Sequence, residues 1–283
     1  MGKKLSNPLI ASSCIATETA DGILKLAANG VQGAILKSCA DYEKGPINGK
    51  RQFACADGCT YASSTFEAEI LTLPECIELM HEARSRVDIL LIPSFTANSL
   101  SPDEWLPACK KLEDAGADAV QLDFFYMGSV FGTEGFSEKI VMLLTELVKN
   151  LNIPVMPKLN VNLPKDYIMP LLVKAGIEYV SLLDSVRCPY YEFDKENNGY
   201  RLSGRLDAET TSCFGHWQLP LTISYTFTAA KHGLKTCAGG GIAGPEDVKR
   251  LLAAGATTVQ SATFLTKYPH KAQDLITGLC ERK

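Results

Sequence analysis

The stretch DAGADAV, residues 114–120, decides the fold. An amphipathic run ends at its glycine, and a run of β-type residues begins about two positions later. KAGIEYV (174–180) and AAGATTV (253–259) repeat this pattern, and AANGVQGAI (27–35) is a looser version. Glycine readily adopts the left-handed conformation that closes many helices. Four such joints at separated points indicate a repeated unit in which a helix leads into the next strand.

Outward from these joints, short β-type runs alternate with amphipathic runs along the whole chain. Eight strands are predicted, at 8–12, 32–37, 89–94, 118–124, 154–159, 178–183, 234–238 and 257–262. Helices are predicted after them, near 19–29, 72–85, 102–115, 137–150, 165–175, 218–232, 245–254 and 270–282. The strands are almost continuously apolar, which is typical of a parallel sheet buried on both faces. The sequence therefore predicts an α/β fold, a (β/α)8 TIM barrel in which residues 1–283 form a single domain.

Two long segments interrupt the alternation, at 38–71 and 184–217. Each follows a predicted strand, so both are expected over the C-terminal mouth of the barrel. Barrels of this type keep their active sites at that face. Long loops in such a place commonly cover a ligand. We therefore expect a small-molecule substrate at the mouth.

Composition excludes several classes of function. The chain has 46% hydrophobic residues, enough for a full core, and its net charge of −4 argues against a nucleic-acid partner. It lacks an apolar run of the roughly 18 residues that a membrane span needs. Asn7 and Pro8 interrupt the short apolar stretch near the N-terminus, so a signal peptide is not expected and a cytoplasmic location is. The ten cysteines are scattered, and Cys55 and Cys59 have no second pair, so no metal site is expected.

A glycine-rich stretch follows the seventh predicted strand. AGGGIAGPEDV (238–248) includes Gly240 and Gly241 and leads into a helix. Backbone N–H groups at such a helix start favour an anion. Thr263, after the eighth strand, adds a hydroxyl, and loops after strands seven and eight commonly bind phosphate in these barrels. A plain flexible turn is the alternative; phosphate binding is the prediction.

Charged residues end four of the predicted strands. Lys37 and Lys158 stand at two strand ends, and Asp123 and Asp184 at two others. A buried lysine needs a partner, which is either a ligand with negative or carbonyl character or one of the two aspartates. A lysine amine in such a place can also form a Schiff base.

The stretch QLDFFYMGS (121–129) places the Asp123 carboxylate next to three aromatic residues in sequence. Tyr126 has a phenol that can donate a proton in catalysis. The alternative is a tyrosine that covers the core and leaves its hydroxyl in water.

The motifs NPLIASS, ILKS, PKLNVN, AGGGIAGPEDV and LLAAGATTVQSATFL resemble, in order and at matching strand ends, those of the dihydroorotate dehydrogenases, most closely the soluble class 1 enzymes. The resemblance extends over nearly the whole chain. It implies a (β/α)8 barrel with FMN at its mouth and a homodimer. It also implies that the cofactor contacts come from Ala11, Ser12, Lys37, Ser38, Lys158, Gly215, Gly240, Gly241, Ala262 and Thr263.

The chain departs from this family where the substrate would bind. The family's N-x-S-C-P-N loop aligns with Asp123 to Gly128, so Tyr126 replaces the Cys or Ser base. An Asn-Ser pair aligns with Asp184 and Ser185. An ionised aspartate only accepts hydrogen bonds, so these positions no longer offer donors to the carbonyl groups of orotate. A donor-rich or cationic substrate is expected instead. The resemblance then assigns substrate binding to Asp123, Asp184 and Ser185, and catalysis to Tyr126, Asp123 and Lys158.

Three functions remain open from the sequence. The first is an FMN oxidoreductase acting on a substrate other than dihydroorotate, with hydride transfer at flavin N5 and proton exchange by Tyr126. The second is a flavin-free lyase or aldolase that holds phosphate at Gly240 and Gly241 and uses Lys37 or Lys158 as the amine. The third is a non-catalytic relative that binds FMN or a metabolite.

Overall fold

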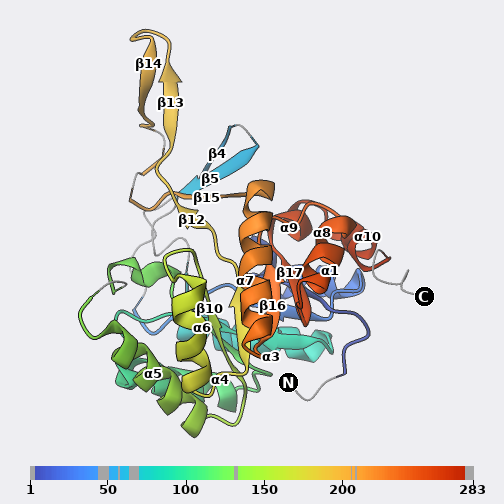
Figure 1. The fold of residues 1–283 in the computed structure, drawn as a ribbon. Helices are drawn as coiled ribbons and strands as arrows, with labels where there is room; N and C mark the ends of the chain where they lie inside the picture. Colours follow the sequence, from blue (N-terminus) through green and yellow to red (C-terminus); the bar gives the residue numbers. More distant parts are fainter. Residues whose placement is uncertain are drawn as a thin grey trace.

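The computed structural model describes residues 4–43, 51–56, 58–63, 70–130, 133–204, 206–207 and 209–277. It shows an α/β fold with a large parallel sheet flanked by helices (Figure 1). Each predicted strand is found in the structure, most with slightly shorter bounds, and the strand predicted at 234–238 is shifted by one residue to Lys235–Gly239. In spatial order the sheet contains β6 (Leu71–Thr72), β3 (Cys39–Ala40), β8 (Ser94–Phe95), β9 (Val120–Asp123), β10 (Val155–Lys158), β11 (Tyr179–Leu182), β16 (Lys235–Gly239), β17 (Thr258–Ser261), β1 (Leu9–Ala11), β2 (Gly33–Ile35) and β7 (Leu90–Ile92).

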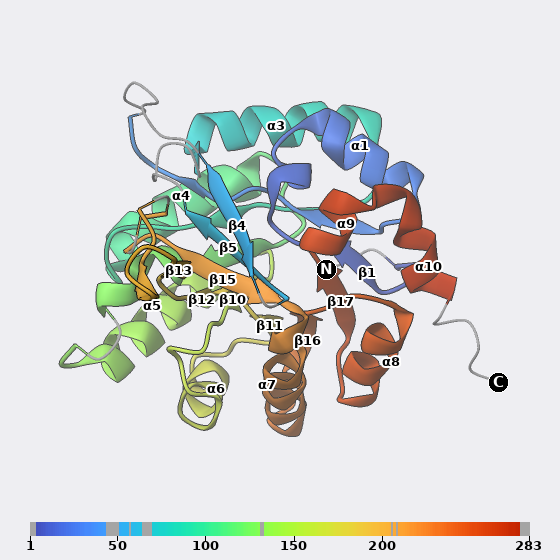
Figure 2. The same cartoon turned by 90° about the horizontal axis from the view of Figure 1, so that it is seen from above.

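The predicted helices are found in the same places. They are α1 (Ala20–Ala28), α3 (Leu73–Arg86), α4 (Pro102–Asp114), α5 (Phe136–Asn150), α6 (Lys165–Lys174), α7 (Leu219–Lys231), α8 (Pro245–Ala253) and α10 (Ala272–Thr277). A further short helix, α9 (Thr263–Lys267), was not predicted. The end of the predicted helix 270–282 lies outside the described residues. Figure 2 shows the helices arranged around the strands. In the described part of the chain, no helix has the length and apolar character that crossing a membrane requires.

The glycines at the repeated joints adopt the conformation that the sequence predicts. Gly116, Gly176 and Gly255 have φ angles of 89°, 80° and 105°. The backbone N–H of each donates to a carbonyl three residues earlier, at the end of the preceding helix. Glycine avoids the steric cost that other residues meet at positive φ. These residues therefore end the helices and direct the chain into the next strand.

Strand pairing links the two ends of the sheet order. β2 and β3 are consecutive pieces of one chain segment, and so are β7 and β8. β2 pairs in parallel with β7, while β3 pairs in parallel with β8. β1 pairs with both β2 and β17. The segment that contains β2 and β3 and the segment that contains β7 and β8 are thus found near both ends of the strand order.

The sheet has a separate hydrophobic core on each of its two faces. The larger core lies between strands and helices. The smaller contains only residues that lie on or next to strands, and they pack on one another: Ile10, Ile35, Leu90, Ile92, Ala119, Met156 and Cys237. These residues belong to six strand segments across the sheet order. One face of the sheet therefore packs against itself, which requires the sheet to curve.

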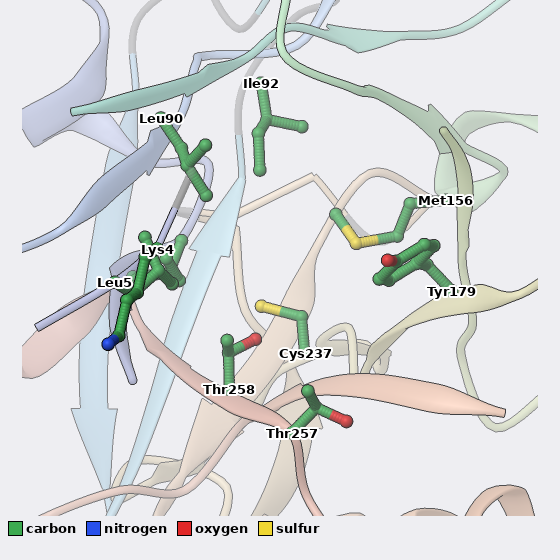
Figure 3. A pocket seen from close by; sticks show the side chains of 10 residues that line it. Lys4, Leu5, Leu90, Ile92, Met156, Tyr179, Cys237, Thr257 and Thr258 are labelled. Atoms are coloured by element: carbon green, nitrogen blue, oxygen red, sulfur yellow. The ribbon is translucent and has the colours of Figure 1, made fainter. Parts of the chain in front are cut away.

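A cavity of about 400 Å³ lies beside this smaller core, at the N-terminal ends of the strands (Figure 3). Its lining is mostly apolar and includes Leu5, Met156 and Tyr179. The charged residues singled out from the sequence lie at the opposite, C-terminal ends of the strands, so this cavity and the predicted site are separate places.

The two long segments form a second, antiparallel sheet. β4 (Gln52–Ala56), β5 (Cys59–Ser63), β15 (Ser212–Gly215) and β12 (Val186–Arg187) pair in the order β12-β15-β5-β4. We call this four-stranded sheet the lid sheet, because β4, β5 and β15 lie over the middle of the molecule in the view from above (Figure 2). A separate hairpin, β13 (Tyr191–Asp194) and β14 (Gly199–Leu202), projects beyond it (Figure 1).

Candidate functional site

The residues predicted from the sequence gather at the C-terminal ends of the strands. Ala11, Asp123 and Lys158 are the last residues of β1, β9 and β10. The others follow strand ends or precede helices: Ser12, Lys37, Ser38, Tyr126, Asp184, Ser185, Gly215, Gly240, Gly241, Ala262 and Thr263. Because parallel strands present these ends on the same edge, the set surrounds one region, which we call the mouth. Within it Lys37, Ser38, Asp123 and Lys158 are buried, whereas Thr263 is exposed.

Asp123 is held by hydrogen bonds on both carboxylate oxygens. Ser38 Oγ donates to Oδ2 at 2.6 Å, and the backbone N–H of Phe125 donates to Oδ1 at 3.0 Å. Burial raises the pKa of Asp123, as does the neighbouring charge of Asp184, and these effects outweigh the lowering by Lys158 and the two hydrogen bonds. Asp123 is thus a carboxyl group that holds its proton to higher pH than an ordinary aspartate.

Lys158 forms a buried ion pair with Asp184. The distance from Nζ to Oδ2 is 3.0 Å, and the two side chains are only 10% and 15% exposed. Burial by itself lowers the pKa of Lys158, but the charges of Asp184 and Asp123 outweigh it, so the net shift is upward. The lysine therefore remains a cation. Of the two partners that the sequence left open for this lysine, the structure contains the aspartate.

The Lys158–Asp184 ion pair bears on the charge that the two aspartates present to a substrate. Asp184 also accepts a hydrogen bond from the backbone N–H of Ser185, at 2.8 Å. Its negative charge is balanced by Lys158, and the pKa of Asp123 is raised by burial and by the charge of Asp184. A cationic substrate would require both carboxylates to face it without another partner. Asp184 does not meet this condition, because it is paired with Lys158.

Two buried residues that the sequence reasoning missed connect to Asp123. Gln121 Nε2 donates to Ser94 Oγ at 2.8 Å, and Ser94 Oγ lies 3.1 Å from Ser38 Oγ. Ser38 in turn donates to Asp123. The result is a buried chain from Gln121 through Ser94 and Ser38 to the carboxylate. Because residues two apart on a strand share a face, Gln121 could have been found from its spacing to Asp123; Ser94 could not, since its partners depend on strand pairing.

A second buried amide lies across the same interior. Gln260 Nε2 donates to Ser181 Oγ at 2.7 Å and to the carbonyl oxygens of Leu182 and Cys237. Together with Gln121 and Ser94 it forms a polar layer between the apolar inner core and the charged mouth. Side-chain polarity therefore increases along the strands toward their C-terminal ends.

The aromatic residues after β9 do not all face the mouth. Phe124 is buried and its ring lies 5.5 Å from that of Trp105 on α4, in the core between sheet and helices. The expectation of three rings beside the carboxylate was wrong for this residue, because consecutive positions near a strand end point to opposite faces. Phe125 and Tyr126 lie in the 3₁₀ turn Phe125–Val130 and pack edge to face at 5.4 Å. Tyr126 is half-buried there.

The glycine-rich loop is shaped by its contacts with α7. Gly240 and Gly241 have φ angles of 98° and 89°. A Cβ on Gly241 would lie 2.5 Å from the backbone nitrogen of Leu219, and one on Gly240 would lie 2.8 Å from the carbonyl oxygen of Leu183. The sequence reasoning attributed these glycines to close approach of a ligand. The structure gives them a different reason, which is close approach of the loop to its own chain.

The start of α8 is already occupied by a carboxylate. Asp247 Oδ2 accepts hydrogen bonds from the backbone N–H groups of Ala243 and Gly244, at 2.9 and 3.2 Å. His216, at the end of the lid sheet, contacts Gly241 O through Nδ1 at 2.8 Å and lies 3.5 Å from Asp247. The N–H groups expected to hold a phosphate at this helix start are therefore partly used by Asp247.

Gly215 links the lid sheet to the mouth. It ends β15 with a φ of 157°, and a Cβ there would lie 2.9 Å from the carbonyl oxygen of Gly58. The 3₁₀ turn His216–Gln218 follows, and Gln218 donates through Nε2 to the backbone oxygens of Leu183 and Asp184. The lid sheet is thus fixed to the segment that carries Asp184.

No family model matches the sequence, and no match is found among the curated proteins. In the described residues there is no group of three or more His, Cys, Asp or Glu side chains able to hold a metal ion.

Proposed function

We propose that the protein is an FMN-dependent oxidoreductase built on a closed (β/α)8 barrel. The closure is supported by the β7–β8 segment, which pairs with β2 through β7 and with β9 through β8, and by an inner core made of residues on or next to strands. The observation that carries the function is the buried Lys158 cation at the mouth, held between two carboxyl groups.

The charge on Lys158 distinguishes between two of the open functions. A lysine that forms a Schiff base must lose its proton to act as a nucleophile. The pKa of Lys158 is raised by Asp184 and Asp123, which disfavours that loss. A permanent cation is suited to stabilise negative charge on a reduced flavin ring. The same residue therefore supports flavin chemistry and argues against its use as a lyase amine.

The residues at the mouth match the ring system of FMN better than its phosphate group. Lys37, Ser38 and Lys158 would contact the ring system, where cations and hydroxyls match its carbonyl edge. Gly240, Gly241, Ala262 and Thr263 would hold the phosphate, with Asp247 limiting its approach to α8. When bound, FMN would supply hydride transfer at N5.

The remaining steps belong to the protein side chains. The half-buried Tyr126 would donate a proton to the substrate carbon next to the one that exchanges hydride. Its phenol suits donation better than abstraction, because the ordinary pKa of tyrosine is about 10. Asp123 and Asp184 would orient the substrate, and the lid sheet would exclude water.

The test begins with the visible absorbance of the purified protein. A yellow protein that releases FMN on denaturation supports the proposal. Lys158→Met should weaken FMN binding strongly, whereas Lys111→Met, on an exposed lysine of α4, should not. In a yellow protein, Tyr126→Phe should retain FMN and slow reoxidation of the reduced protein by an activated alkene. A protein that is colourless and does not bind added FMN would contradict the proposal, and borohydride trapping on Lys37 would favour the lyase instead.

A further inference from the structure

Three cysteines lie side by side in the lid sheet. Cys213 is in the middle strand β15, with Cys59 on β5 to one side and Cys188, just after β12, on the other. Cys213 is paired in register with Tyr61 and with Val186. Residues two apart on a strand share a face, so Cys59 and Cys188 are on the same face of the sheet as Cys213. We call these three residues the thiol row.

Within the row, Cys59 and Cys213 are the pair in contact. Their side chains share a hydrogen bond, and Tyr61 also bonds to Cys213. The Cys188 Sγ instead donates to the carbonyl oxygen of Pro189 at 3.6 Å. Cys213 is buried, and Cys59 is partly exposed. A reagent in solution therefore reaches Cys59 first and finds Cys213 directly behind it.

This pair has no part in the site at the mouth. Cys59 belongs to the first long segment and Cys213 to the second, and the contact of β5 with β15 is what joins these segments into one sheet. A covalent bond between them would fix the lid sheet across two parts of the chain that are distant in sequence.

We propose that Cys59 and Cys213 form a disulfide bond when the protein meets a peroxide or a small-molecule disulfide, and that this bond locks the lid sheet. The proposal does not depend on FMN binding, because it concerns thiols outside the mouth.

The chemistry balances with either oxidant. With hydrogen peroxide, the Cys59 thiolate attacks one oxygen, giving a sulfenic acid and hydroxide, which takes up a proton as water. Cys213 sulfur then attacks the Cys59 sulfur, hydroxide leaves and takes up the thiol proton as water, and the S–S bond forms. Two electrons pass from the thiols to the peroxide. With a small disulfide, Cys59 first forms a mixed disulfide and releases one thiol, and Cys213 then displaces the second.

The environment of Cys213 sets the pace of the second step. Burial raises the pKa of Cys213 to about 11, with further contributions from the neighbouring Cys59 and Cys188. Tyr61, which faces it from β5, has its own pKa raised to about 12, so it remains neutral. Only the thiolate attacks, so the rate of ring closure should rise about tenfold per pH unit below that pKa. The bond should form slowly at neutral pH and faster in mildly alkaline solution.

The experiment treats the full-length protein with hydrogen peroxide or oxidised glutathione, alkylates the remaining thiols and digests without reduction. Mass spectrometry should find a Cys59–Cys213 peptide, with two free thiols lost per chain, and the oxidised protein should show a higher Tm and slower proteolysis of the lid sheet. Cys55→Ser is the matched control. Cys55 lies on β4 of the same sheet but is paired with Thr60 on the opposite face, so its loss should change nothing.

Three results would contradict a Cys59–Cys213 disulfide. A Cys188–Cys213 bond, a bond between two chains, or a lasting sulfenic acid at Cys59 would overturn the proposal. Cys59→Ser and Cys213→Ser should each abolish the cross-linked peptide and the Tm increase. If either variant fails to fold, the corresponding alanine variant and the peptide map of the wild-type protein decide the question. FMN content, measured on the same samples, tests the proposed function separately.

Discussion

At the scale of single residues, the mouth depends on how three charges are arranged. Lys158 holds Asp184 directly, and Asp123 is held by Ser38 and the backbone. A buried ion pair contributes little net stability compared with apolar residues of the same size, but loss of one partner leaves the other charged and buried. Substitutions here should therefore have large and unequal effects.

Lys158→Met should destabilise the fold by about 3–5 kcal/mol, because Asp184 then keeps a buried charge without its cation. Adding Asp184→Leu should recover most of that loss. The free energies of unfolding come from urea denaturation. Lys111→Met removes an exposed ion pair with Asp41 and should cost under about 1 kcal/mol. A double variant no more stable than Lys158→Met alone would contradict this account.

Asp123 should make stability depend on pH. Its pKa is raised in the folded state, so folding favours the protonated form. This contribution is fully present below the pKa of the unfolded chain and is lost as pH rises through the folded pKa. Asp123→Asn, which stays neutral, should then be more stable than the wild type at neutral pH, with a gap that closes in acid. Unfolding midpoints measured across that range provide the test.

Removal of the Ser38 hydroxyl should raise the pKa of Asp123 further, because that hydroxyl donates to the carboxylate. Carbon-detected NMR titration of the Asp123 carboxyl in Ser38→Ala measures the shift. Ser38→Thr keeps a donor and should restore most of the wild-type value. An unchanged pKa in Ser38→Ala would show that the bond has no effect on the carboxyl.

At the scale of elements, strands and helices were more predictable than their contacts. The eight strands are visible in the sequence because each is a short, mostly apolar run, and several of them begin shortly after a glycine such as Gly116 or Gly255. The lid sheet was not predicted, because β5 pairs with β15 and no local pattern reports a pairing across that separation. Asp123 and Lys158 were found from their positions at strand ends. Ser94 was missed because its role comes from strand pairing.

The glycine-rich loop offers an element-scale prediction. Gly241→Ala combines a positive φ with a Cβ 2.5 Å from Leu219 N, so it should destabilise the protein by roughly 2–4 kcal/mol. Gly244→Ala is the matched control, because a Cβ there meets nothing within 4 Å. Its cost should be under about 1 kcal/mol. Equal losses in thermal unfolding for the two variants would show that contact with α7 does not determine the choice of glycine.

At the scale of the whole molecule, the β13–β14 hairpin stands apart from both sheets. Its two strands pair only with each other, and one face carries the exposed side chains Tyr191, Phe193, Tyr200 and Leu202. Two-stranded hairpins gain little stability on their own. The hairpin is therefore an addition to the fold and not a support for it.

The hairpin should be removable without loss of the fold. Ser203 N donates to Tyr190 O at 2.8 Å, so the two ends of the hairpin are already joined by a hydrogen bond. Replacement of residues 191–202 by a two-residue Asn-Gly turn should change the free energy of unfolding by less than about 0.5 kcal/mol. Urea denaturation of the shortened chain measures this, and a loss several times larger would place the hairpin within the cooperative fold.

The increase in polarity along the strands has an electrical consequence. Beneath the ions of the mouth lie an amide and hydroxyl layer and then the apolar side chains of the smaller core, which polarise far less than water. The field of Lys158 and its carboxylates is therefore poorly dissipated downward and is directed toward the space under the lid sheet. The interior therefore screens charges at the mouth only weakly. Adding or removing one charge there would change the electrostatic potential at a molecule bound under the lid sheet.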